Sequence, residues 1–327
     1  MRPVVSVIIP IFNEEEIIAE LYRRMTVVME GMAEPYELVL VNDGSRDTSL
    51  QKMQELAAKD QRLKIVDFSR NFGHQVAITA GMDHASGEAI VIIDADLQDP
   101  PEVIPRLVER WREGYDVVYA VRAKRHGDTF FKRVTAAGFY RILHRITSVD
   151  IPVDTGDFRL MSRRAVDALK QVRERHRFIR GLVSWIGFKQ IGVEFVREER
   201  FAGETKYPLK KMLKFAFDGI TSFSFLPLQL ATYLGFFASL LAFLGIFAVV
   251  GLKLFTSLPL PGWASLMVCT LLLGGVQLIT LGIIGEYIGR IYDEVKQRPL
   301  YFTKDLVNFE LADRIAPTET NHLETSR

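Results

Sequence analysis

The chain has 327 residues, enough for one large domain or two modest ones, and 48% of them are hydrophobic, a share that leans toward membrane contact. Its 41 Lys and Arg residues nearly balance its 40 Asp and Glu residues, which gives a net charge of +1. No overall positive field would draw such a protein to nucleic acid, so a nucleic-acid partner is not expected.

The first half of the chain alternates apolar, β-favouring segments with segments of helical periodicity. Strands are predicted over residues 4–9, 36–41, 63–68 and 89–93, with helices in the intervals between them. The apolar N-terminal segment is too short for a secretory signal and is predicted to be the first strand. This alternation implies parallel pairing in a doubly wound α/β sheet, whose ligands bind beyond the carboxyl ends of the strands.

A polar side chain follows each of these four strands. Asn13, Asp43, Asn71 and Asp94 all occupy predicted strand ends, and although any one of them could cap a helix, together they would line one edge of the sheet. The loops contain neither G-x-G-x-x-G nor G-x-x-x-x-G-K-[ST], so both a dinucleotide fingerprint and a P-loop are excluded. Phosphate binding must then depend on a metal ion or on basic side chains.

The fourth strand ends in an unusually acidic sequence. Asp94, Asp96 and Gln98 alternate directly after it, and in an extended segment such residues share one face. Three oxygen-bearing side chains in one space suit a hard divalent cation that keeps positions open for phosphate oxygens. The alternative is that Asp94 or Asp96 only caps the helix whose start is indicated by Pro100 and Pro101.

Further α/β elements follow the acidic stretch. The pattern predicts helices over residues 103–112, 131–146 and 163–170, strands over 117–121 and 192–197, and an acidic turn before an apolar segment within 152–160. Arg122 falls at a strand end, and the basic segment 124–133 after it suits a mobile or solvated loop. The arginine-rich stretch 173–185, which includes Trp185, is equally typical of contact with lipid headgroups and of an ordinary amphipathic helix.

The second half of the chain has the character of a membrane protein. Residues 208–226 alternate lysines with apolar residues at helical spacing, as an interfacial helix does, and the runs 227–252 and 263–285 carry no charge. Each run exceeds the roughly 20 residues that span a bilayer core of about 30 Å. The second contains the only cysteine, Cys269, which suits a reducing compartment. The alternative is a pair of helices buried in a large soluble core.

These patterns divide the chain into five regions. We expect a cytoplasmic catalytic domain over 1–207, a juxtamembrane helix over 208–226, transmembrane helices over 227–252 and 263–285, and a C-terminal helix and tail over 286–327, disordered at the end. The cations flank the outer ends of the hairpin, so the positive-inside bias places both termini in the cytoplasm. The protein is thus predicted to be integral to an inner or plasma membrane.

Five blocks of sequence resemble a known family. In order along the chain, residues 7–14, 42–45, 69–73, 94–101 and 200–207 are similar to family 2 glycosyltransferases of the polyprenyl-phosphate type, which have the GT-A fold. That group includes dolichyl-phosphate mannose synthases and bacterial enzymes that make polyprenyl-phosphate glucose. The resemblance extends to about residue 310 and includes the hairpin. It implies a Rossmann-like, mostly parallel sheet with helices on both faces.

The resemblance also assigns roles to individual residues. Residues for the nucleotide sugar would be Pro10, Asn13, Glu14, Asp43, Gly44, Asn71, Asp94 and Ala95. Mg²⁺ or Mn²⁺ would be held by Asp94, Asp96 and Gln98, and phosphates, including the lipid phosphate, by Arg122, Arg133, Arg200 and Lys206. Asp157 matches the family's candidate base and, with Asp96, would be catalytic. The acceptor phosphate, with a second pKa of about 6, needs little deprotonation. Asp157 could then instead orient cations or the sugar.

The implied reaction is inverting transfer of a hexose, with glucose and UDP-glucose favoured, to an undecaprenyl or dolichyl type of phosphate. Membrane lipids are further expected partners, and we expect a homo-oligomer. A processive polysaccharide synthase would share Asp94 and Asp96, but the sequence 171–175 departs from its Gln-x-x-Arg-Trp motif at the last two positions. A non-catalytic nucleotide-binding membrane scaffold is a second alternative. Flipping of the lipid-linked sugar is a third idea, for which several chains would have to assemble.

Overall fold

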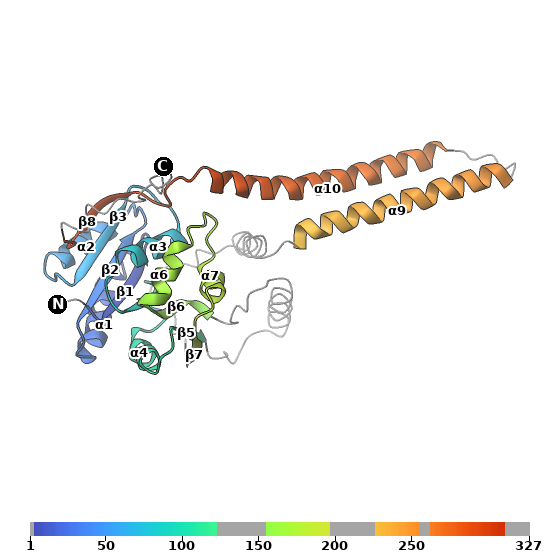
Figure 1. Ribbon diagram of the computed structural model, residues 1–327. Coiled ribbons are helices and arrows are strands. Elements are labelled where there is room, and N and C mark those ends of the chain that lie inside the picture. The colour runs from blue at the N-terminus through green and yellow to red at the C-terminus, as the bar shows by residue number, and fades with distance from the viewer. Residues whose placement is uncertain (1–2, 123–154, 197–225, 256–261, 311–327) are drawn as a thin grey trace, which may run out of the picture. The chain divides into compact units, whose positions relative to one another are not determined.

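The computed structural model describes residues 3–122, 155–196, 226–255 and 262–310. These residues fall into two compact units. An α/β unit contains the described residues before position 197 and those from Arg298 onward, and a helical unit contains those between 226 and 297 (Figure 1). The predicted helices over 131–146 and 208–225 and the predicted disordered tail lie outside the described residues.

The α/β unit is built on one eight-stranded sheet. Its strands are β1 (Val5–Ile11), β2 (Tyr36–Asn42), β3 (Leu63–Phe68), β4 (Ala89–Ile92), β5 (Val117–Arg122), β6 (Thr155–Ser162), β7 (Gln190–Phe195) and β8 (Thr303–Val307). They lie in the order β7-β5-β6-β4-β1-β2-β3-β8. β1 pairs in parallel with β2 and β4, as β2 does with β3 and β5 with β7, whereas β6 and β8 run antiparallel to their neighbours. The mostly parallel sheet predicted from the sequence is confirmed.

Helices cover both faces of this sheet. They are α1 (Ile18–Gly31), α2 (Ser49–Ala57), α3 (His74–His84), α4 (Ile104–Arg112), α6 (Arg163–Gln171) and α7 (Ile179–Trp185), with the short 3-10 helix η1 (Pro101–Val103) before α4. Val7 and Ile9 of β1 point into the core that α1 covers, and the alternate residue Ile8 touches Gly81 of α3 on the other face. The prediction of helices on both faces is therefore confirmed.

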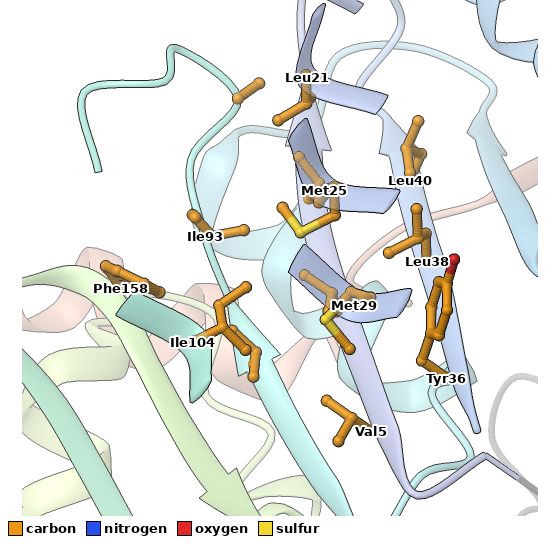
Figure 2. Packing of buried hydrophobic residues seen from close by; sticks show 14 of the residues in the cluster. Val5, Leu21, Met25, Met29, Tyr36, Leu38, Leu40, Ile93, Ile104 and Phe158 are labelled. Carbon is orange, nitrogen blue, oxygen red and sulfur yellow. The ribbon is translucent and has the colours of Figure 1, made fainter. Parts of the chain in front are cut away.

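The core beneath α1 follows from its sequence spacing. Leu21, Met25 and Met29 recur every fourth residue and are buried, and Figure 2 shows them in the same hydrophobic cluster as Leu38 and Leu40 of β2. Burial of one such side chain contributes about 1.5–3 kcal/mol. The packing fixes α1 against the sheet and thereby anchors the loop that connects β1 to α1.

Two segments differ from the prediction. Residues expected to form an acidic turn before an apolar segment instead enter a strand at Thr155, which places Asp157 inside β6. This is tolerated because the buried carboxylate of Asp157 has cationic partners. The region expected to be a C-terminal helix and tail continues α10 (Trp263–Val295) and then adds β8 to the edge of the sheet. β8 escapes prediction because its short sequence has no apolar run.

The helical unit consists of α9 (Leu226–Phe255) and α10, which pack against each other. The most apolar 18-residue stretches within Leu226–Ala248 and Ser265–Val295 have mean hydropathies of 2.0 and 2.2, and almost none of their residues is buried. A helix of either length is long and apolar enough to cross a membrane. Because their apolar side chains stay exposed, these helices are not core helices of the described α/β unit, against the alternative left open by the sequence.

Candidate active site

The carboxyl ends of β1, β2 and β3 carry loops that are joined by hydrogen bonds. The backbone N–H of Asn13 donates to Ser45 Oγ at 3.0 Å, and Asn13 Oδ1 accepts from the N–H of Arg46 at 2.8 Å. Asn71 Nδ2 donates to the carbonyl of Asp43 at 3.1 Å. The structure therefore brings together three of the four polar residues that the sequence places at strand ends.

Asp43 is the buried centre of these loops. It is 3% exposed, and it accepts hydrogen bonds from the N–H groups of Phe72 at 2.7 Å and Gly73 at 3.0 Å. Burial raises the pKa of Asp43, although the two backbone donors oppose that change. Asp43 thus fixes the loop after β3 to the end of β2.

The loop after β1 is held to the loop after β2. Asn13 has a φ of 53°, a left-handed conformation that asparagine tolerates, and the N–H of Glu14 donates to Ser49 Oγ at 2.9 Å. Pro10 is buried within β1, opposite Val41 of β2. The predicted nucleotide residues of this region are therefore held in one rigid group.

Gly44 allows the loops after β2 and β3 to approach each other. Its φ is +66°, and a Cβ added there would lie 2.5 Å from the backbone C of Arg70 and the backbone N of Asn71. Neither the conformation nor the space accommodates another residue. The glycine of the Asn42–Ser45 block is therefore required for the site to close.

The acidic sequence after β4 is not extended as predicted. β4 ends at Ile92, residues 95–98 turn, and Leu97 has a φ of 56°. The turn arises because the N–H of Gln98 donates to Asp96 Oδ1 at 3.1 Å. The expectation that Asp94, Asp96 and Gln98 share one face of a strand is therefore wrong in its geometry, and their metal role stays a prediction. Ala95 lies buried within this turn.

Asp94 is a carboxylate short of partners. Its Oδ1 atom is buried and accepts no hydrogen bond from the described residues. Burial raises the pKa of Asp94; the charges of Asp157 and Asp96 add to this effect, whereas His74 opposes it. Among the described residues no three His, Cys, Asp or Glu side chains are placed to hold a metal ion. A buried carboxylate oxygen without a hydrogen bond nevertheless suits a divalent ion that takes further oxygens from a ligand.

A second carboxylate, Asp157, faces Asp94 across His74. The Nε2 atom of His74 lies 3.4 Å from Asp94 Oδ1 and 3.3 Å from Asp157 Oδ2. Arg180 of α7 donates from Nε to Asp157 Oδ1 at 2.8 Å and from Nη2 to Asp157 Oδ2 at 3.2 Å. Burial alone would raise the pKa of Asp157, but Arg180 and His74 hold it well below its usual value. Asp157 is therefore a permanently ionised group between two cations.

His74 was not predicted from the sequence. Burial lowers its pKa, but the hydrogen bond to Asp157 and the charges of Asp94 and Asp157 outweigh burial and raise the pKa to about 9. His74 directly follows the 69–73 block and begins α3. This position next to a family block could have identified it as a candidate site residue. Its partners come from β6 and from the turn after β4, and only the folded sheet brings them together.

Arg122, a predicted phosphate ligand, ends β5. Its guanidinium lies 3.9 Å from the buried carboxylate of Asp99, and a Cβ on Gly156 would approach it to 2.9 Å. Arg122 therefore lies beside the segment that carries Asp157. The other three predicted phosphate ligands, Arg133, Arg200 and Lys206, lie outside the described residues.

Comparisons with known proteins were made for the whole chain. Residues 6–170 match the model of the family described as Glycosyl transferase family 2. An uncharacterized glycosyltransferase, YkcC, of Bacillus subtilis is 59% identical over 93% of this chain and 94% of its own length. The SfII prophage-derived bactoprenol glucosyl transferase of Shigella flexneri is 45% identical over 92% and 97%. The solved structure of mannosyltransferase PcManGT from Pyrobaculum calidifontis, in complex with GDP-Man and Mn²⁺, is 18% identical over 90% and 88%, with a TM-score of 0.44.

Replacement of Gly44 by alanine should destabilise the site. A left-handed alanine costs about 1–2 kcal/mol, and the added methyl group would displace the backbone of Arg70 and Asn71. We expect a lower melting temperature for Gly44→Ala in the detergent-solubilised chain. Gly31→Ala is the matched control because nothing lies within 4 Å of its Cβ position. Equal melting temperatures for the two variants would contradict the packing described.

The charge of His74 should stabilise the metal-free protein in a pH-dependent way. The folded-state pKa of about 9 exceeds the unfolded value of 6.5. The stabilisation is therefore complete below about pH 6.5 and lost as the pH rises through about 9. In EDTA, the difference in melting temperature between wild type and His74→Gln should be largest near pH 6 and shrink toward pH 10. A difference that does not change with pH would rule out this pairing.

Proposed function

This chain belongs to glycosyl transferase family 2, and we propose that it transfers a hexose from a nucleotide sugar to the phosphate of a polyprenyl phosphate. The observation that carries the proposal is the edge of the sheet, where Asp43 and its loops lie beside the carboxylates that follow β4. The relatives named bactoprenol glucosyl transferases, which align along nearly the whole chain, support a polyprenyl acceptor.

The nucleotide sugar would bind at the hydrogen-bonded loops after β1, β2 and β3. Asn13, Asp43, Gly44 and Asn71 form the wall of this site, with Pro10, Glu14 and Ala95 close along the chain. A buried carboxylate suits recognition of the hydroxyl and N–H groups of a nucleoside, because an ionised acceptor forms strong hydrogen bonds. We favour UDP-glucose, since the names of several relatives specify glucosyl transfer.

A divalent cation, Mg²⁺ or Mn²⁺, would be held by Asp94, Asp96 and Gln98. When bound, such an ion neutralises the charge that develops on a departing diphosphate. The unsatisfied Oδ1 atom of Asp94 and its raised pKa support the assignment, because a cation would relieve both. Asp96 is held in the turn by the N–H of Gln98.

The acceptor would be a lipid whose phosphate reaches the α/β unit at the membrane surface. Arg122 and, beyond the described residues, Arg133, Arg200 and Lys206 would bind phosphate, for which the forked guanidinium is well suited. The two long apolar helices support an integral membrane protein. We propose that both termini and the catalytic unit are cytoplasmic, that the product forms on the cytoplasmic leaflet of an inner or plasma membrane, and that the chain forms a homo-oligomer.

The reaction would be a single displacement. An oxygen of the acceptor phosphate forms a bond to the anomeric carbon while the bond from that carbon to the diphosphate oxygen breaks, so the configuration inverts and the nucleoside diphosphate leaves. A phosphate monoester is already largely dianionic near neutral pH. Asp157, ionised and paired with Arg180, is a weak base, so we assign it to orienting His74 and Arg180.

Incubation of membranes with labelled nucleotide sugars and undecaprenyl phosphate tests the proposal. UDP-glucose with Mg²⁺ should give a labelled product that partitions into organic solvent, and EDTA should abolish it. Asp96→Ala should lose about 100-fold or more of the transfer, the range for one group stabilising a transition state. Glu109→Ala, an exposed carboxylate on α4, should keep full activity. A water-soluble polymer would favour a processive synthase, and no product with any donor would favour a scaffold.

The variant Asp157→Asn tests whether Asp157 acts as a base or as a positioning residue. We expect a loss of about 100-fold, the cost of a misplaced group. The acidic limb of the pH–rate profile, near pH 6, should persist in both proteins because it reports the acceptor phosphate. If the limb disappeared in Asp157→Asn, Asp157 would be the titrating base and the assignment would be wrong.

A further inference from the structure

The segment Tyr301–Phe309, here called the strap, follows α10 and binds the α/β unit. It contains β8, whose residues pair antiparallel with β3, from Ile65 with Val307 to Phe68 with Thr303. The strap therefore begins beside the carboxyl end of β3, where the loop Ser69–Gly73 starts, and Figure 1 shows β8 next to β3. No role of the strap follows from the motifs, since none of the family blocks includes it.

Both ends of the strap are anchored by side chains, of which Tyr301 is buried and Asn308 is partly buried. The ring of Tyr301 is 4% exposed and stacks on Phe68 with centroids 5.1 Å apart, and its hydroxyl donates to Asp83 at 3.0 Å. At the other end, Asn308 Nδ2 donates to the carbonyls of Ala57 and Leu63 at 2.8 Å each. These side-chain contacts add to the backbone pairing between β8 and β3. Together they hold the strap at one position on the sheet.

Between these anchors the strap contacts the loop Ser69–Gly73. The N–H of Ser69 donates to the carbonyl of Phe302 at 3.0 Å, and the rings of Phe302 and Phe72 lie 6.4 Å apart. Phe72 also packs edge-on against Phe68, and the guanidinium of Arg70 lies 4.1 Å from the centre of its ring. The side chain of Phe302 is 55% exposed and makes no contribution to the core that would explain its size.

The same loop holds Asp43. The two N–H groups that bind the carboxylate of Asp43 belong to Phe72 and Gly73, and Asn71 binds its carbonyl. A continuous set of contacts thus runs from Phe302 through Phe72 to the carboxylate assigned to the nucleoside. We propose that the strap positions the nucleoside diphosphate sugar, with Phe302 as a positioning residue that acts through Phe72 on Asp43. This inference rests on the proposed function.

Phe302→Ala tests the strap in the purified full chain. An aromatic pair is worth a factor of about two to ten in an equilibrium constant, so the Kd for UDP and the KM for UDP-glucose should rise by that factor. The kcat and the KM for undecaprenyl phosphate should stay unchanged. Phe302→Leu, which keeps apolar bulk, should recover part of the loss. Thr303→Ala, an exposed neighbour on the same strap, is the matched control and should match wild type.

Hydrogen exchange at the amides of residues 69–73 gives a readout that does not depend on activity. Exchange should accelerate in Phe302→Ala and stay unchanged in Thr303→Ala, with equal melting temperatures. Unchanged UDP affinity in Phe302→Ala, or a fall in kcat alone, would overturn the inference while leaving wild-type transfer intact. If wild type neither bound UDP nor transferred glucose, the proposed function would fail, and the donor role of the strap would be overturned even if loop exchange still rose.

Discussion

Two buried carboxylates that face one positive side chain dominate the electrostatics of this site. Asp94 and Asp157 lie on either side of His74, and among the described residues Asp157 alone of the two forms a second ion pair, with Arg180. Like charges in a poorly solvated space repel each other unless cations lie between them. The excess negative charge is therefore left on Asp94, at the end of the strand where a diphosphate with its cation would be needed. The two carboxylates therefore differ in their electrostatic environment although both lie against His74.

Much of the α/β unit could be predicted because its signals are local. The strands from β1 to β4 are rich in apolar residues, and their predicted bounds agree with the structure to within two residues. Asn13, Asp43 and Asn71 could be placed at one edge because parallel strands bring their carboxyl ends together. The turn that contains Asp96 was not predictable in this way. Its shape depends on a positive φ at Leu97, and a leucine in a sequence does not predict a positive φ.

The other features that the sequence did not predict depend on contacts between distant segments. Asp157 was expected to belong to an acidic turn, yet it lies in β6 because Arg180 and His74, from two helices, neutralise it there. β8 is a short strand whose residues are exposed or only partly buried. Its strand conformation therefore comes from pairing with β3 and from the anchors of the strap. The periodicity of one segment does not predict these strands, because the energy that stabilises them comes from residues far away in the sequence.

The position of β8 has a consequence for how the protein matures. Asn308 binds the carbonyl of Ala57, which precedes it by 251 residues. A ribosome makes the chain from its N-terminus, so β1 to β7 and both apolar helices are synthesised before the edge strand exists. Until β8 has been synthesised, one side of β3 has no partner strand. A chain interrupted after α10 would therefore lack the edge strand that contacts the loop Ser69–Gly73, so the α/β sheet is completed only after α10 has been made.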